Sequence, residues 1–100
     1  MDLDRTPVGE LVLEHRDEIL DLVRRHHGRS VSVFGSVASG DATAQSDVDL
    51  LVDFEPGSSL LDVVRLEDAL AAVLGRPVDV VSAGALLDRD EEIRRQAVPL

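Results

Sequence analysis

Cysteine, lysine, tyrosine and tryptophan are all missing from this 100-residue sequence. The absence of cysteine excludes disulfides and zinc sites built on thiolates. The absence of lysine excludes Schiff-base chemistry and the lysine of a P-loop. Aromatic residues make up 2% of the chain and hydrophobic residues 44%, so the core must be aliphatic.

Long apolar segments are missing as well. No run approaches the roughly 20 residues that a membrane-spanning helix needs, and the acidic stretch Met1 to Arg5 is unlike a signal peptide. We therefore expect a cytoplasmic protein with no membrane partner. A length of 100 residues suits one domain, so we expect residues 1–100 to form a single domain.

The chain carries a net charge of −10, and all ten of its basic residues are arginine. Proteins that grip a nucleic-acid backbone cluster Lys and Arg on one face, so we expect no direct nucleic-acid binding. An acidic chain suits a metal site or a basic partner. The alternative is that the charge only keeps a small protein soluble.

The N-terminal part of the chain has the apolar spacing of a helix. Thr6-Pro7 predicts its start, with Thr6 as the N-cap and Pro7 at the first helical position. The pattern continues to His27, and Gly28 is the predicted stop. The three histidines match no ligand spacing elsewhere, so we interpret them as residues of the helix surface or its packing.

Ser59 predicts the start of a second helix, because Asp62 three residues later can complete a capping box. Gly75 predicts its end. Its expected buried face consists of Leu60, Val63, Val64, Leu70, Val73 and Leu74. Residues 83–96 are expected to form one or two short charged helices, and Pro99 to end the ordered part.

The three predicted strands are Ser30–Phe34, Val48–Phe54 and Val78–Val81. The second and third strands flank a helix, and a right-handed crossover makes them parallel. The first strand can run antiparallel to the second. The expected class is therefore α/β (α+β), a small mixed sheet with helices packed on one face.

Acidic residues gather on the opposite face of that sheet. Side chains alternate along a strand, so Asp47 and Asp49 point away from the apolar face. Asp79 has the same orientation on the third strand. If the two strands are parallel neighbours, these three carboxylates converge. Asp53 lies farther along the strand and is interpreted as a surface residue.

Three close carboxylates repel one another, and divalent cations remove that cost. Mg²⁺ prefers such oxygen ligands and shares its shell with substrate phosphates. Two ions roughly 3.5–4 Å apart can serve the attacking and leaving oxygens of a displacement. Asp79 could complete the site and accept the proton of the attacking group.

Gly35-Ser36 follows the first strand and opens a short helical segment. Glycine lets a phosphate approach the backbone closely, and the following N–H groups and hydroxyl can bind it. A Gly-Ser pair alone is an ordinary turn, and Asp-x-Asp alone is usually a solvated strand edge. Their combination, in this order and with Asp79, carries the hypothesis.

The run Val33–Gly40, together with Ser46–Val52, resembles the signature of the polymerase-β nucleotidyltransferase superfamily, in which Gly-Ser precedes Asp-x-Asp by about ten residues. The Pro77–Val81 strand and the segment Ile93–Leu100 resemble the minimal nucleotidyltransferases. These are similar to antitoxins whose partner is a HEPN-domain toxin, an RNase.

The resemblance implies an Mg²⁺-dependent enzyme that transfers AMP from ATP to a tyrosine of the HEPN toxin. Gly35 and Ser36 would bind the triphosphate. Asp47, Asp49 and Asp79 would be the metal ligands, and Asp79 the base. Because the chain has no tyrosine, the acceptor must be on another chain.

One position departs from the family pattern, since Ser39 stands where many members have Arg. Arg29 and Arg76 are possible substitutes that the sequence does not place. The alternative function is therefore an antitoxin that neutralises its partner by binding alone. Nucleotide transfer to RNA or to a small molecule is less favoured, because the chain lacks a basic groove and an additional substrate domain.

Overall fold

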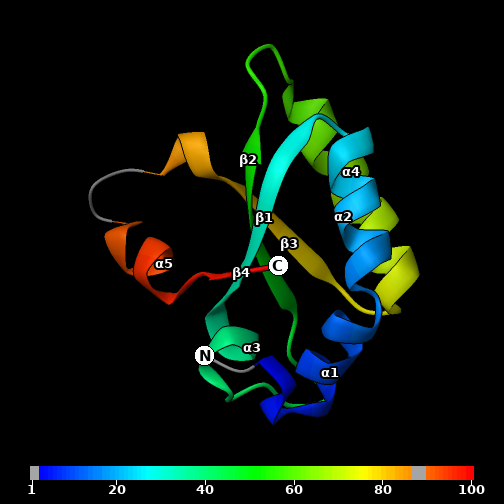
Figure 1. The fold of residues 1–100 in the computed structure, drawn as a ribbon, viewed down its shortest axis with the longest axis vertical. Coiled ribbons are helices and arrows are strands. Elements are labelled where there is room, and N and C mark those ends of the chain that lie inside the picture. Colours follow the sequence, from blue (N-terminus) through cyan, green and yellow to red (C-terminus); the bar gives the residue numbers. More distant parts are fainter. Residues whose placement is uncertain (1–2, 87–89) are drawn as a thin grey trace.

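A four-stranded mixed sheet forms the centre of the molecule (Figure 1). The computed structural model describes residues 3–86 and 90–100. The strands are β1 (Gly28–Phe34), β2 (Val48–Phe54), β3 (Val78–Ser82) and β4 (Val98–Pro99), in the spatial order β3-β2-β1-β4. The β2 and β3 strands are parallel, and β1 is antiparallel to both β2 and β4. The predicted mixed sheet is therefore confirmed.

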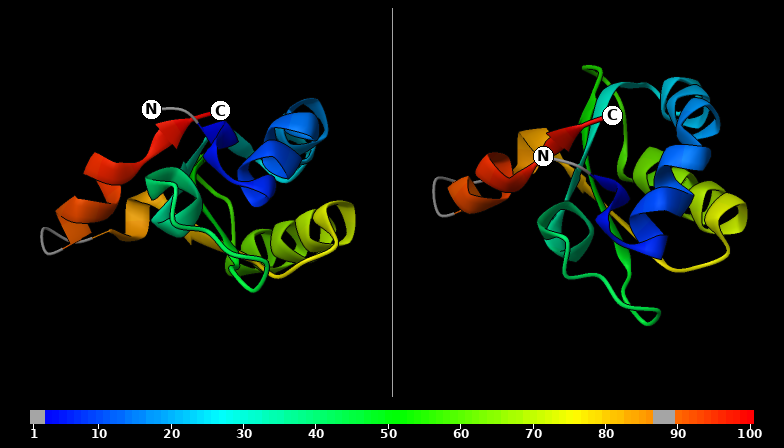
Figure 2. Two further views of the ribbon diagram at one scale, coloured as in Figure 1. Left: turned by 90° about the horizontal axis from the view of Figure 1, so that it is seen from below. Right: turned by 60° about the horizontal axis from the view of Figure 1, so that its bottom comes forward.

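Helices α1 (Pro7–Glu14), α2 (Arg16–Arg25) and α4 (Leu60–Leu74) form a layer along one side of the sheet (Figures 1 and 2). The short α5 (Glu91–Gln96) lies across the sheet from α2 and α4 and contacts α3 (Gly35–Ser39). Within residues 3–86 and 90–100, no helix is both long enough and apolar enough to cross a bilayer.

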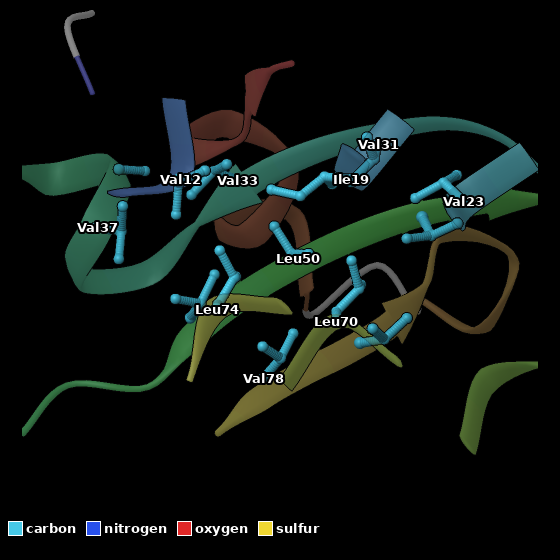
Figure 3. Packing of buried hydrophobic residues seen from close by; sticks show 14 of the residues in the cluster. Val12, Ile19, Val23, Val31, Val33, Val37, Leu50, Leu70, Leu74 and Val78 are labelled. Atoms are coloured by element: carbon cyan, nitrogen blue, oxygen red, sulfur yellow. The ribbon is translucent and has the colours of Figure 1, made fainter. Parts of the chain in front are cut away.

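The core lies between the sheet and the helical layer. Its members are aliphatic, as the scarcity of aromatic residues requires. On β2, alternate residues Val48, Leu50 and Val52 are fully buried, and α2 and α4 contribute Ile19 and Leu70 (Figure 3). Burying one such side chain stabilises the fold by about 1.5–3 kcal/mol. This confirms the predicted apolar face of β2 and leaves the intervening aspartates on the other face.

The predicted N-terminal helix starts at the expected position but is divided in two. The Thr6 hydroxyl accepts a hydrogen bond from Gly9 N–H at 3.1 Å, and Pro7 occupies the first turn. The helix breaks at His15, which separates α1 from α2. The His15 Nδ1–H donates to the carbonyl of Leu11 at 3.0 Å, so the ring satisfies a carbonyl at the end of α1.

The predicted stop at Gly28 is wrong by one residue. His27 has the left-handed backbone, with a φ of 69°, and Gly28 is the first residue of β1. Glycine is required at 28 for space instead, because a Cβ there would lie 2.9 Å from Cγ1 of Val52 and even closer to Val23. The chain reversal falls on His27 because Gly28 packs between α2 and β2.

The cap and the end of α4 are confirmed. Ser59 and Asp62 form the capping box, and Gly75 ends the helix with a φ of 67°. The predicted buried face is partly wrong, because Leu60 is 79% exposed and Val64 is 44% exposed.

The face of α4 that the core uses explains the error. The fully buried residues are Leu66 and Leu70, with Leu74 nearly so. Val64 lies two residues before Leu66, about 200° round the helix, so it points away from the sheet. The sequence contains apolar residues on more than one side of α4, and spacing alone did not distinguish the sides.

The C-terminus adds a strand that was not predicted. Val98 pairs with Val33, and the N–H of Leu100 donates to the carbonyl of Val31 at 3.0 Å. Pro99 therefore lies in an edge strand, where its missing N–H is tolerated. Of the one or two short charged helices expected over residues 83–96, α5 is present, whereas Ala83–Ala85 is an uncharged 3-10 helix and residues 87–89 lie outside the described residues.

Candidate active site

The turn from β1 into α3 lies directly against Asp49. Gly35 has a φ of 70°, in the left-handed region that favours glycine. A Cβ at Gly35 would also overlap the Oδ2 atom of Asp49. Glycine is thus required for two independent reasons, the backbone turn and the carboxylate beside it. The Gly-Ser turn and the Asp-x-Asp segment consequently form one site.

Asp49 and Asp79 are neighbours on adjacent parallel strands. They are register partners on β2 and β3, and their side chains share the face opposite the core. Asp47 precedes β2 by one residue and is exposed. The structure therefore brings the three predicted carboxylates to one end of the sheet, where β1 ends and β2 and β3 begin.

The three carboxylates influence one another electrostatically. The pKa of Asp49 is raised above its ordinary value, chiefly because burial penalises the anion. The charges of Asp79 and then Asp47 raise it further, and a hydrogen bond from Asp49 to Asp79 favours the protonated form. Every interaction that shifts the Asp49 pKa thus disfavours the carboxylate, and no described arginine opposes them.

This arrangement fits a divalent cation. Oxygen ligands with excess negative charge suit Mg²⁺, which takes one or two carboxylates and completes its shell with water and phosphate. Among residues 3–86 and 90–100, no three His, Cys, Asp or Glu side chains are close enough to enclose a metal by themselves. The charges of Asp79 and Asp47 nevertheless both act on Asp49 and raise its pKa.

Hydrogen bonds to the carbonyl of Ser36 stabilise the end of α3. The Ser36 carbonyl accepts from the N–H of Asp41 at 2.9 Å and from the hydroxyl of Ser39 at 3.2 Å. Ser39 also donates to Asp41 Oδ2 at 3.0 Å. Ser39, where the resemblance leads us to expect arginine, is therefore bonded within its own turn, and the hydroxyl of Ser36 lies outside these contacts.

The two arginines considered as substitutes have other partners. Arg29 is paired with Asp53 at 3.2 Å, at the far end of β2. Arg76 donates to the backbone carbonyl of Ser46 at 2.9 Å. Sequence reasoning missed Arg5, whose side chain packs against Gly40 just after α3, with its Cδ 2.8 Å from where a Cβ would lie. No local pattern links residues that are so far apart in the chain.

These features can be compared with known proteins. The nucleotidyltransferase domain family matches residues 14–98, which include the turn, the three aspartates and the strands β1, β2 and β3. The chain belongs to this family. The resemblance noted in the sequence is thereby confirmed, and the chain is a nucleotidyltransferase.

Individual relatives agree with this assignment. The protein adenylyltransferase MntA of Thermococcus cleftensis is 44% identical, with 76% of this chain and 82% of MntA aligned. A solved minimal nucleotidyltransferase is 46% identical, with a TM-score of 0.82 over 100% of this chain and 97% of that one.

A more distant match is a solved complex from Shewanella oneidensis, a tri-AMPylated HEPN toxin with its MNT antitoxin. The identity is 19% and the TM-score 0.67, with 87% of this chain and 69% of that chain aligned. At this identity the likeness shows a shared fold.

Proposed function

We propose that this nucleotidyltransferase is an antitoxin that transfers AMP from ATP to a tyrosine of a HEPN-domain RNase toxin, with Mg²⁺ as the cofactor. The observation that carries the proposal is the packing of Gly35 against Asp49, with Asp79 as the register partner of Asp49. The 44% identity to a protein adenylyltransferase supports a protein as the acceptor. The solved complex of a HEPN toxin with an antitoxin of the same fold supports a HEPN toxin as the partner.

The aspartates would bind the metal. Asp47, Asp49 and Asp79 would hold the Mg²⁺, and we expect two ions. Mg²⁺ supplies positive charge that offsets the phosphates and the excess charge of the carboxylates. Burial and like charge disfavour the Asp49 anion, so this end of the sheet is prepared for a cation.

The turn would bind the triphosphate. Gly35 brings the backbone of the turn against Asp49, and Ser36 follows it at the start of α3. The tyrosine oxygen then forms a bond to the α-phosphorus of ATP as the bond to pyrophosphate breaks. Asp79 accepts the phenolic proton. Catalysis of this kind depends on positioning and charge, which a small domain can provide.

The test is mass spectrometry of the HEPN toxin after incubation with this protein, Mg²⁺ and each nucleoside triphosphate in turn. We expect a mass increase of one or more AMP groups with ATP, located on a tyrosine of the toxin. Absence of labelling with every nucleotide, from a preparation that binds the toxin, would contradict the proposal.

Neutralisation by binding alone is the second candidate. The observation in its favour is that Ser39 bonds within its own turn and supplies no charge to the phosphates. Asp47→Asn separates the two functions, because it leaves the fold and the acidic surface largely unchanged. If this variant still suppresses the RNase at equal stoichiometry, binding is sufficient. If it forms the complex without suppressing the RNase, transfer is required.

A further inference from the structure

The dipeptide Arg76-Pro77, just before β3, holds the backbone on both sides of Asp47. Arg76 Nη1 donates to the carbonyl of Ser46 at 2.9 Å. The N–H of Val48 donates to the carbonyl of Pro77 at 3.1 Å. Asp47 lies between these two anchors, and β3 continues from Pro77 into Val78 and Asp79. One short segment is therefore hydrogen-bonded to the residues on either side of Asp47, and it continues along the chain to Asp79.

The loop before Asp47 is shaped by hydrogen bonds within residues 43–46, and Ala42 at its start packs against the core. The N–H of Thr43 donates to the Ser46 hydroxyl at 2.8 Å, and the N–H of Ser46 donates to the Thr43 carbonyl at 3.0 Å. These bonds shape a turn without fixing its position on the domain. Arg76 provides a further connection, with a second and longer contact of 3.5 Å to the carbonyl of Ala44.

The guanidinium of Arg76 is held where it can make this contact. Its Nε is buried and, among the described residues, has no hydrogen-bond partner. The side chain also lines a cavity of about 280 Å³ together with Pro7, Val8 and Leu11 of α1. Leaving a buried N–H without an acceptor is unfavourable, so the packing around the stem and the Nη1 contacts must offset that cost.

We infer that Arg76 is a positioning residue, which fixes Asp47 relative to Asp49 and Asp79 through the carbonyl of Ser46. The inference rests on the proposed role of these aspartates as metal ligands. Arg76 acts through geometry, because its contact is with the backbone carbonyl of Ser46. Residues that orient metal ligands indirectly commonly change metal affinity by about 10–100-fold when they are replaced.

The test measures the affinity for Mn²⁺ alone, by calorimetric titration in the absence of nucleotide and toxin. Arg76→Met keeps the apolar stem and removes the donors, and we expect it to weaken Mn²⁺ binding by about 10–100-fold. Arg76→Lys retains one donor group and should recover part of the affinity. Arg29→Met is the matched control, because Arg29 pairs with Asp53 at the other end of β2. It should bind Mn²⁺ as the wild type does.

Transfer of AMP to the toxin provides the second measurement. In Arg76→Met, excess Mg²⁺ should restore the rate, which a misfolded variant would not show.

Mn²⁺ affinity in Arg76→Met equal to that of wild type would overturn the inference, as would equal losses of Mn²⁺ affinity in Arg76→Met and Arg29→Met. If wild type transfers no AMP while Arg76→Met still weakens Mn²⁺ binding, the inference holds and the proposed function fails. If Arg76→Met does not fold, Arg76→Lys and Arg29→Met decide between these outcomes.

Discussion

The two ends of β2, which lie far apart along the strand in Figure 1, place acidic residues in opposite surroundings. Near Phe54, Asp53 pairs with Arg29, and Asp62 accepts a hydrogen bond from His27 at 3.2 Å. The pKa of Asp62 is lowered, first by its hydrogen bond with the backbone of Ser59 and then by His27. At the Val48 end, burial and two other carboxylates raise the pKa of Asp49.

The difference separates carboxylates that have partners within the chain from those proposed to bind a metal. Where the chain supplies its own donors and cations, the anion contributes to the fold. Where it supplies only further carboxylates, the anion costs stability that an external cation can offset. A sequence motif that contains Asp does not distinguish the two cases, whereas the partners of each Asp do.

The largest expected effect on stability comes from replacing two glycines, one near each end of β2, with alanine. Gly35 and Gly57 both have a positive φ, of 70° and 90°. A Cβ at Gly57 would meet nothing within 4 Å, whereas one at Gly35 would overlap Asp49. Gly57→Ala should cost about 1–2 kcal/mol of the free energy of unfolding, from the backbone alone.

Gly35→Ala should lower the free energy of unfolding by about 1–3 kcal/mol more than Gly57→Ala does, because Asp49 must also move. Urea denaturation of both variants measures the difference. AMP transfer should be lost in Gly35→Ala and preserved in Gly57→Ala. Equal stability of the two variants would show that Asp49 does not lie against the turn in solution.

The pH dependence of stability should differ between the two ends. Because the folded-state pKa of Asp49 is raised, its ionisation is harder in the folded than in the unfolded chain. Its contribution to stability therefore falls as the pH rises from about 3.8, its ordinary value, through the folded pKa. Asp49→Asn should accordingly stabilise the metal-free protein at neutral pH, and this gain should vanish near pH 3.8.

The contribution of Asp62 to stability should change with pH in the opposite direction to that of Asp49. Its folded-state pKa is lowered, so its stabilising contribution is present above 3.8 and is lost as the pH falls through the folded value. Asp62→Asn should therefore destabilise the protein at neutral pH. Chemical denaturation of both variants against wild type, at a series of pH values and with a chelator present, measures the two trends. If the two substitutions changed stability in the same direction at neutral pH, the proposed difference between the two ends of β2 would be contradicted.

The smallest expected effect comes from adding a cation to the site. Ser39→Arg removes the hydroxyl contacts with Ser36 and Asp41 and introduces a charge near the turn. Since an exposed charge pair contributes about 0–1 kcal/mol, we expect an increase in the transfer rate of no more than several-fold. Steady-state kinetics of toxin labelling measures it. A gain of several hundred-fold would mean that the missing arginine had limited catalysis.

The sequence was informative where local rules decide the structure. Alternation on β2 predicted which aspartates share a face, and the crossover through α4 predicted that Asp79 would lie beside Asp49. The capping box of Ser59 and the stop at Gly75 are local as well, and both are present.

The errors depend on packing between distant segments. The left-handed backbone conformation was predicted at Gly28 and is found at His27, because Gly28 must fit against Val52. The strand at Val98 is too short to produce a periodic pattern, and it forms only by pairing with Val33. The contact between Arg76 and Ser46 joins residues 30 positions apart, which no spacing rule could detect.

The comparison of the two ends is tested most directly by AMP transfer to the HEPN toxin by Asp49→Asn and Asp53→Asn. The substitutions are chemically identical and lie four residues apart on the same face of β2. We predict that Asp49→Asn lowers the transfer rate by a factor on the order of 10²–10³, as when one charge-stabilising group is lost. Asp53→Asn should transfer AMP at the wild-type rate. Equal rates in the two variants would contradict the assignment of the Val48 end as the active site.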